Sequence, residues 1–235
     1  MESKRKFVHH IFESIYDKYD FINNLISLGL HKKWRRDAIN RLGDISNCSI
    51  VDLCCGTGDF TIALAKKAGN NSLITGIDFS ENMLTIAKEK ASRENVKNIK
   101  FVHCNVLTMP FESNTFDVAT ICFGLRNIVD YRQALIEINR LLKPNGKFAC
   151  MDMSHPTIPG YRKLCYGFVK YGVPFIGKLW ANKPNEYAWL FESMQNFPDK
   201  FQLADEIFAQ GFTYPKIKTY AGGIVALHVC TKTMN

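Results

Sequence analysis

Between residues 49 and 153 the sequence alternates short apolar runs with amphipathic helical patterns, and this alternation constrains the fold more than any other feature. The apolar runs predict strands at 49–53, 72–78, 99–104, 116–123 and 147–153. Helical spacing predicts helices between them, at 59–67, 80–94 and 131–142, the second of which Ser80 can cap. Because strands that alternate with helices form βαβ units, we expect a mostly parallel sheet with helices on both faces.

The segments on either side of this alternation differ in kind. Residues 8–20 and 32–42 have helical spacing, and the second stretch follows Gly29. Residues 156–198 are rich in proline, glycine and aromatic side chains. A helix at about 199–210 and β segments at 213–220 and 223–232 follow. Gly222-Gly223 is typical of a hairpin turn, so we expect a late hairpin that adds an antiparallel edge strand.

Length and composition limit the class of protein. The chain has 235 residues, of which 46% are hydrophobic and 22% charged, as in one large globular α/β domain. No apolar run reaches the roughly 18 residues that a membrane-spanning helix needs. The N-terminal segment has no apolar signal-peptide core, so we expect a cytoplasmic protein.

The eight cysteines do not form a recognisable framework. They are scattered, without a CxxC pair or a Cys/His cluster at zinc spacing. We therefore expect reduced core thiols and no metal site.

The net charge of +8 is unevenly placed, because residues 154–185 contain five basic residues and no acidic one. Such a surface can meet nucleic acid, anionic lipid or an anionic metabolite, or can simply be a solvated face.

A glycine-rich loop follows the first predicted strand and opens a helix. It contains Asp52, Cys54, Gly56 and Gly58, and its glycines let the backbone turn tightly against a ligand. Asp78 ends the next strand, where a carboxylate can accept both ribose hydroxyls of a nucleoside. The alternative for Asp78 is a role in starting the following helix. This order of elements predicts a nucleotide-type site.

Three details select the nucleoside. The dinucleotide fingerprint needs a third glycine, but Asp59 and Phe60 follow the loop, and no Walker lysine is present. Asn105 and Val106 follow the third strand, where a polar group and an apolar wall can meet an adenine. This combination resembles the class I S-adenosylmethionine (SAM) methyltransferases. The resemblance implies that SAM contacts seven residues: Gly56, Thr57, Gly58, Asp78, Asn105, Val106 and Cys122.

The flanking motifs are more specific. Four segments resemble the ubiquinone/menaquinone biosynthesis C-methyltransferases. They are YDxINxxISxxxHxxW at 19–34, FGLRN at 123–127, NRLLKPNG at 139–146 and GGIVALH at 222–228. This resemblance covers about residues 7–230. It implies a class I methyltransferase Rossmann-like seven-stranded sheet with a late hairpin. The chain would then divide into an N-terminal helical lid (1–43), a SAM-binding core (44–153), a substrate or lid insert (154–198) and a C-terminal helix and hairpin (199–235).

Six positions depart from the family pattern: Cys54, Cys122, Leu141, Asn145, Asp152 and Met153. The family usually has glycine at Cys54, often has serine at Cys122, and commonly has glutamate at Asp152. The aspartate keeps the charge but shortens the reach by one carbon.

The resemblance implies transfer of a methyl group from SAM to a ring carbon of a prenylated quinol, without a metal. A phenol titrates near 10, so a base or a nearby cation must favour the phenolate. We expect the naphthoquinol of menaquinone synthesis as substrate, with a benzoquinol of the ubiquinone pathway, or both, as alternatives. An RNA methyltransferase and a non-catalytic SAM-binding scaffold are remote alternatives, since no RNA-binding module is visible.

Three residues are catalytic candidates. Arg126 can stabilise the phenolate, unless it forms an ion pair with Asp130 or Asp152. His31 is the first candidate base because imidazole titrates near neutral pH, and a structural hydrogen bond is its alternative role. Asp152, at a strand end, is the second candidate base.

The remaining candidates concern the substrate. Tyr19, Asn23 and Asn127 are expected to line the quinol head pocket. The first two can instead line the cofactor lid, or cap or bridge the first two helices. Residues 164–180 are apolar and aromatic with interspersed lysines, which suits a pocket for the prenyl tail and contact with a membrane surface, or ordinary core packing. A homodimer is left open, and no nucleic-acid partner is expected.

Overall fold

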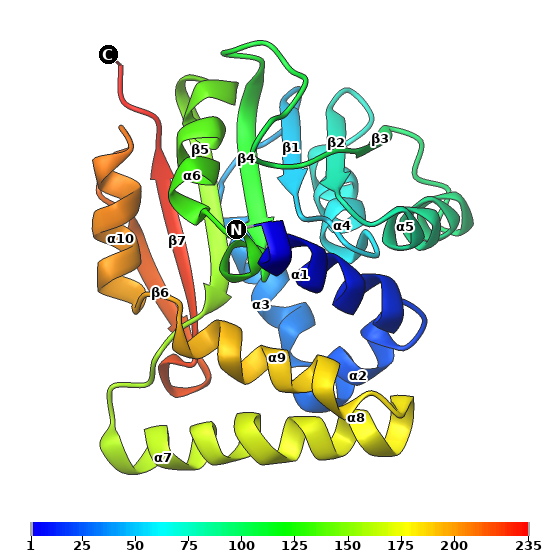
Figure 1. The fold of residues 1–235 in the computed structure, drawn as a ribbon. Helices are drawn as coiled ribbons and strands as arrows, with labels where there is room; N and C mark the ends of the chain where they lie inside the picture. The colour runs from blue at the N-terminus through cyan, green and yellow to red at the C-terminus, as the bar shows by residue number, and fades with distance from the viewer. Residues whose placement is uncertain (1, 235) are drawn as a thin grey trace.

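The computed structural model describes residues 2–234, and a seven-stranded sheet with the order β3-β2-β1-β4-β5-β7-β6 forms its centre (Figure 1). The strands are β1 (Ser49–Leu53), β2 (Leu73–Asp78), β3 (Ile99–His103), β4 (Phe116–Cys122), β5 (Leu142–Met153), β6 (Lys216–Tyr220) and β7 (Val225–Thr231). The first five pair in parallel, and β7 is antiparallel to both β5 and β6. The predicted mixed sheet with a late hairpin is confirmed.

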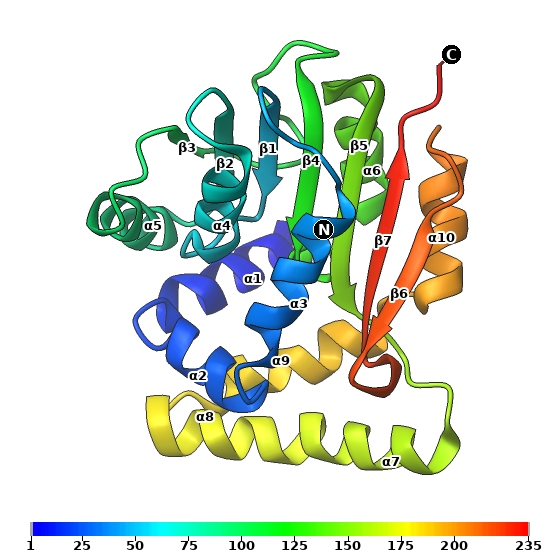
Figure 2. The same cartoon turned by 180° about the vertical axis from the view of Figure 1, so that it is seen from behind.

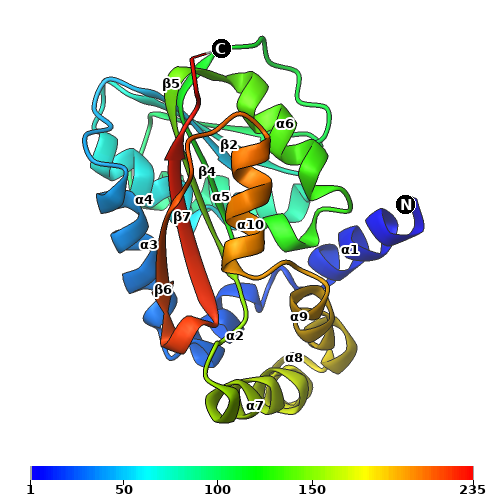
Figure 3. The same cartoon turned by 90° about the vertical axis from the view of Figure 1, so that its left-hand side faces the viewer.

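Helices cover both faces of this sheet. The helices α3 (Leu30–Arg41) and α4 (Asp59–Ala68) lie on one face, with α5 (Glu81–Arg93) beside α4. The helices α6 (Tyr131–Leu141) and α10 (Lys200–Ala209) lie on the other face (Figure 3). Each face has its own buried layer, with Leu135 and Ile207 in one and Ile39 and Leu64 in the other. The sheet is therefore buried on both sides, which explains why its central strands are apolar throughout.

The remaining helices gather at the carboxyl ends of the parallel strands (Figures 1 and 2). These are α1 (Glu2–Ile15), α2 (Tyr19–Ile26), α7 (Pro159–Gly167), α8 (Val173–Ala181) and α9 (Pro184–Gln195). A π-helical turn, Phe168–Gly172, joins α7 and α8 into one rod, and α9 packs back on α8. Ile15, Ile22 and Val173 share a small core that holds these helices together. They cover the edge of the sheet where ligands bind in such folds.

Local signals explain where several elements begin. The Ser80 hydroxyl accepts a hydrogen bond from the Met83 N–H and starts α5, as the sequence predicts. Asp199 and Gln202 form a reciprocal capping box at the start of α10. Gly29 precedes α3 with φ of +73°, a conformation in which glycine is favoured.

Three expectations differ from the structure. The single helical stretch expected at 8–20 is broken between Ile15 and Tyr19, so α2 is a separate helix. Strand β5 begins at Leu142 rather than 147, because an irregularity beside Phe116 lets the chain rejoin β4 early. The antiparallel strand is not at the edge, since β7 lies between β5 and β6.

The eight cysteines are free thiols, as expected. Among residues 2–234, no helix is both long and apolar enough to cross a membrane.

Candidate active site

A first cavity of about 580 Å³ lies at the carboxyl ends of β1, β2, β3 and β4, beneath α1. Its lining includes most of the residues expected to meet SAM, namely Gly56, Asp78, Asn105, Val106 and Cys122. Tyr19 and Asn127, expected near the quinol, also line it. Segments far apart in the sequence thus meet at one cavity because the parallel strands end at the same edge.

Asp78 is the buried carboxylate of this cavity, with 5% of its surface exposed. One of its oxygens accepts the Gly56 N–H at 2.8 Å and the other accepts the Ser80 N–H at 3.0 Å. Burial raises the pKa of this carboxyl, although the backbone N–H groups oppose the shift. Each oxygen keeps a further lone pair, so the carboxylate can hold the start of α5 and still accept a pair of hydroxyls.

The two loop glycines have different surroundings. Gly56 has φ of +54°, and a Cβ there would project into open space, so its backbone can approach a ligand. Gly58 does not line the cavity, and a Cβ there would lie 2.8 Å from the Cβ of Ala87. The structure thus places Gly58 where α4 and α5 pack closely, and its expected contact with the cofactor stays a prediction. Cys54, where the family usually has glycine, has φ of +53°.

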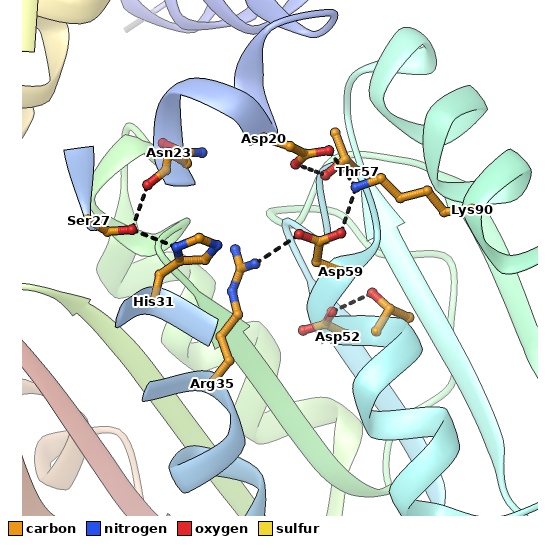
Figure 4. Close-up of polar contacts among 10 residues, drawn as sticks. Asp20, Asn23, Ser27, His31, Arg35, Asp52, Thr57, Asp59 and Lys90 are labelled. Atoms are coloured by element: carbon orange, nitrogen blue, oxygen red, sulfur yellow. Dashed lines mark hydrogen bonds and ion pairs between the residues drawn. The ribbon is translucent and has the colours of Figure 1, made fainter. Parts of the chain in front are cut away.

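Thr57 also lies outside the cavity lining, because its hydroxyl donates to the Asp20 carboxylate of α2 at 2.6 Å. The Lys90 ammonium of α5 contacts the same carboxylate at 2.5 Å and Asp59 at 2.6 Å (Figure 4). The Arg35 guanidinium lies 3.4 Å from Asp59. These contacts fasten α2 and α3 onto the glycine loop.

A second cavity of about 400 Å³ lies on the other side of α2. One end is polar, with Tyr19, Asn23, His31, Arg35 and Arg126. The rest is apolar and comes mainly from the rod of α7 and α8 with neighbouring segments, including Leu164, Phe168, Val169, Val173, Leu190 and Ile224. A polar head with an apolar continuation suits a hydroxylated ring that has a hydrocarbon tail.

Tyr19 and Phe123 line both cavities and form their common wall. Phe123 has φ of +62°, which is rare for an aromatic residue and typical of a strained functional site. Burial raises the pKa of the Tyr19 hydroxyl, while the charges of Arg126 and Arg35 oppose the rise. The two cavities are therefore adjacent at Tyr19 and Phe123.

Arg126 and Asp152 form a buried ion pair. The guanidinium lies 2.6 Å from the carboxylate, and the two side chains are 8% and 1% exposed. The same carboxylate accepts the backbone N–H groups of Arg126 at 3.1 Å and Met153 at 2.7 Å. Asp152 lines neither cavity, so the structure places this expected base as the counter-ion that positions Arg126. From the sequence, this ion pair is the expected alternative to a role of Arg126 in stabilising the phenolate.

His31 lies in α3 with 6% of its surface exposed. Its Nδ1 is 2.6 Å from the Ser27 hydroxyl, which itself donates to the Asn23 carbonyl at 2.6 Å. The imidazole Nδ1–H therefore donates to Ser27, and Nε2 keeps a free lone pair. Burial, with help from the charge of Arg35, lowers the pKa of His31 to about 4. The expectation that this imidazole titrates near neutral pH is wrong, and His31 is a neutral imidazole there.

Two further candidates lie in or beside the FGLRN motif. The Asn127 Oδ1 accepts the indole N–H of Trp189 from α9 at 2.9 Å, which ties the insert to this motif. Burial raises the pKa of the Cys122 thiol to about 12, so it stays protonated beside the first cavity.

Sequence reasoning missed Arg35, one of five basic residues between Lys32 and Arg41. Helical spacing contained the signal, because Arg35 lies one turn after His31 and one turn before Ile39, which is buried.

Comparison with known proteins gives a consistent result. A model of the ubiE/COQ5 methyltransferase family matches residues 1–232. A demethylmenaquinone methyltransferase of Shouchella clausii is 44% identical over 231 residues, covering 98% of both chains. Proteins with the same name from Oceanobacillus iheyensis and Staphylococcus aureus are 43% and 42% identical, covering 97% of this chain and 95% and 94% of their own.

Solved structures with low sequence identity share the fold. A SAM-dependent methyltransferase of Thermotoga maritima aligns with a TM-score of 0.69 at 19% identity, covering 95% of this chain and 99% of its own. A SAM-dependent methyltransferase of Aquifex aeolicus aligns with a TM-score of 0.62 at 16% identity, covering 85% and 89%. The expected class I methyltransferase fold is confirmed.

Proposed function

This chain belongs to the ubiE/COQ5 methyltransferase family, and from that premise we propose that it methylates a ring carbon of a demethylmenaquinol with SAM as donor. The observation that supports this most is the pair of cavities with Tyr19 and Phe123 as common wall. One cavity has the carboxylate that a nucleoside ribose needs, and the other has a polar head and an apolar continuation. The names of the relatives favour the naphthoquinol over the benzoquinol.

In this proposal SAM occupies the first cavity. The Asp78 carboxylate accepts the ribose hydroxyls, and Asn105 and Val106 face the adenine. The open backbone at Gly56 lies against the methionine part, and Cys122 lies beside it as a neutral thiol. Thr57 and Gly58 support the loop from behind, through Asp20 and α5 respectively.

Bound SAM supplies a sulfonium methyl group, and the methyl–sulfur bond breaks as the ring carbon forms its new carbon–carbon bond. The chain's own residues make that carbon more nucleophilic by favouring the phenolate. The free lone pair of His31 Nε2 can accept the hydroxyl proton. After the attack, the ring proton passes to water and His31 returns its proton to the ring oxygen, which restores the aromatic quinol. Arg126, fixed by Asp152, holds the head of the substrate cavity in place, and Asn127, fixed by Trp189, lies in the wall of the SAM cavity.

Methyl transfer from radiolabelled SAM tests this proposal. A demethylmenaquinol, a demethylated benzoquinol and bulk RNA are assayed in parallel, and we expect label in the naphthoquinol alone. Label in both quinols would make the enzyme dual-purpose, and label only in RNA would overturn the proposal. Asp78→Asn should weaken binding of S-adenosylhomocysteine by roughly tenfold or more, because a charged acceptor is lost. Asp205→Asn, on the exposed part of α10, is the matched control.

We also propose that the protein docks on an anionic membrane surface, from which a prenylated substrate can enter. The outer face of the rod of α7 and α8 exposes large apolar side chains at intervals of three to four residues: Tyr161, Leu164, Phe168, Tyr171, Phe175 and Leu179. Lys163, Lys170 and Lys178 lie on the same rod. Tyr161, Leu164 and Phe168 also line the second cavity, so its apolar end is continuous with this face.

Flotation with phosphatidylcholine vesicles, with and without phosphatidylglycerol, tests the membrane proposal. We expect the wild type to float only with the anionic vesicles, because apolar contact and lysine charge act together. Phe175→Ser with Leu179→Ser should abolish flotation. Phe201→Ser with Phe208→Ser, which alters equally exposed aromatic residues of α10, should leave it unchanged. Absence of flotation of the wild type would contradict the proposal.

A further inference from the structure

Two arginine guanidinium groups reach the polar end of the second cavity, and their partners differ. Arg126 has a full counter-ion in Asp152 at 2.6 Å. Among the described residues, the ion-pair partner of Arg35 is Asp59 at 3.4 Å, and that carboxylate contacts Lys90 more closely, at 2.6 Å. Arg35 also contacts the Cys122 thiol, which is not a counter-ion. The cavity therefore contains one cation that is closely paired and one that is not.

The hydrogen-bond donors of Arg35 are also underused. A guanidinium has five N–H donors, and buried donors are normally satisfied. The Arg35 side chain is 17% exposed, and its Nε has no hydrogen-bond partner among the described residues. The same holds for the Nε of Arg126, so the two guanidinium groups differ in the close counter-ion that Arg126 has in Asp152. Two carboxylates, Asp20 and Asp59, balance the charges of Lys90 and Arg35. Both carboxylates lie closest to Lys90, so Arg35 is the more weakly paired cation. Arg35 is thus left with donors for a further acceptor.

Position relates Arg35 to the expected base. It lies one helical turn after His31, and Figure 4 shows its guanidinium between the imidazole and Asp59. The positive charge of Arg35 contributes to the lowered pKa of His31. A phenolate formed beside Arg35 would compensate this charge, so the protonated imidazole that forms in the same proton transfer is stabilised.

We propose that Arg35 binds the anionic ring oxygen of the deprotonated quinol, and that Arg126 holds the neighbouring loop rather than this charge. The inference rests on the proposed function, and it names the residue that stabilises the phenolate. The hydroxyl proton passes to His31, and the negative charge stays on the ring oxygen beside Arg35 until the ring carbon attacks. The α-carboxylate of SAM is a second source of an anionic oxygen for Arg35. Cys122, which lies beside Arg35, lines the first cavity, where SAM is proposed to bind.

A naphthol that does not oxidise, such as a 4-alkoxy-1-naphthol, tests the inference when it is titrated by absorbance in the presence of S-adenosylhomocysteine. We expect the wild type to lower the pKa of the bound naphthol by about one to three units. Arg35→Gln should abolish most of that shift, and Arg35→Lys should keep part of it. Arg36→Gln, an exposed neighbour on α3, should titrate as the wild type.

The same variants separate the two sources of the anion. Weaker binding of S-adenosylhomocysteine to Arg35→Gln, with unchanged binding of 5′-methylthioadenosine, which lacks the carboxylate, would assign Arg35 to the cofactor and overturn the inference. A wild-type naphthol titration in Arg35→Gln, or no pKa shift in the wild type, would overturn it too. Thermal unfolding of each variant checks its fold. If the wild type methylates the quinol in the transfer assay while the naphthol result is negative, only this inference fails, whereas absence of transfer contradicts the proposed function itself.

Discussion

The indole N–H of Trp189 donates to the Asn127 side-chain oxygen at 2.9 Å, and this hydrogen bond joins the helical insert to the FGLRN motif. Asn127 is 7% exposed and lines the first cavity. A residue of the insert, which supplies much of the second cavity, therefore positions a residue of the first. The arrangement leads to a direct test of how the insert supports catalysis.

Trp189→Phe should lower the free energy of unfolding by about 1–3 kcal/mol, because it leaves the buried Asn127 oxygen without its donor. Methyl transfer should fall as well, since the loop that contains Arg126 loses support. Chemical denaturation and the radiolabel assay measure the two effects. Trp180→Phe, a half-exposed tryptophan of α8, is the control. Equal losses in both variants would mean that tryptophan bulk, rather than the hydrogen bond, is responsible.

Gly58→Ala and Gly29→Ala separate close packing from backbone conformation. Both glycines have the left-handed backbone, with φ of +82° and +73° and ψ near 0°, but a Cβ at Gly58 would lie 2.8 Å from the Cβ of Ala87, whereas at Gly29 the nearest atom would be 3.4 Å away. Both alanines should cost about 1 kcal/mol for the left-handed backbone. Gly58→Ala should cost roughly a further 1–3 kcal/mol for overpacking. Unfolding curves in urea measure the difference, and equal midpoints would show that α4 and α5 separate without cost.

His31 should make stability depend on pH in acid. Its folded pKa of about 4 lies below the ordinary value of 6.5, so between these values the unfolded chain binds a proton that the folded chain does not. The stability that His31 contributes above pH 6.5 is lost as the pH falls from 6.5 to 4, and below 4 the loss is complete. His228 has a lowered pKa from burial and adds an effect of the same sign.

Unfolding measured at several pH values in wild type and His31→Gln isolates this contribution. The variant should lose less stability than the wild type between pH 6.5 and 4, because one of the two histidines no longer titrates. Parallel pH profiles would contradict the lowered pKa of His31.

The ion pair of Arg126 and Asp152 should be sensitive to removal of either partner. Asp152→Asn leaves a buried guanidinium without a counter-ion, which typically costs about 3–5 kcal/mol. Asp152→Glu, the residue common in the family, should retain most stability and turnover. Arg126→Lys keeps the charge but loses the planar fork, so we expect kcat to fall with little change in cofactor affinity. Normal turnover of Arg126→Lys would show that a positive charge opposite Asp152 is enough for catalysis and that the planar guanidinium is not needed.

Much of the fold between residues 49 and 153 follows from local sequence. Each strand there is a short apolar run, and helix α5 begins at Ser80, whose side chain caps it as predicted. The break after Ile15 was not predictable from spacing, because apolar residues continue through Tyr16 and Tyr19. Its position depends on packing of α2 against α8, which is distant in sequence.

The site was predictable to the extent that its residues follow strand ends. Asp78, Asn105 and Cys122 are brought together because parallel strands finish at one edge. The roles of Asp152 and Thr57 depend on partners far away in the sequence, Arg126 and Asp20, which no local pattern indicates. The lowered pKa of His31 likewise arises from burial and from Arg35, both of which appear only in the folded chain.

The hydrogen bond between Thr57 and Asp20 connects the glycine loop, which precedes α4, to the helix that supplies Tyr19. The hydrogen bond thus joins the loop beside the first cavity to the wall that the two cavities share. In the proposed function, displacement of either part by the first ligand changes the free energy with which the second binds. Since such coupling is reciprocal, the quinol must alter the affinity for SAM by the same factor by which SAM alters the affinity for the quinol.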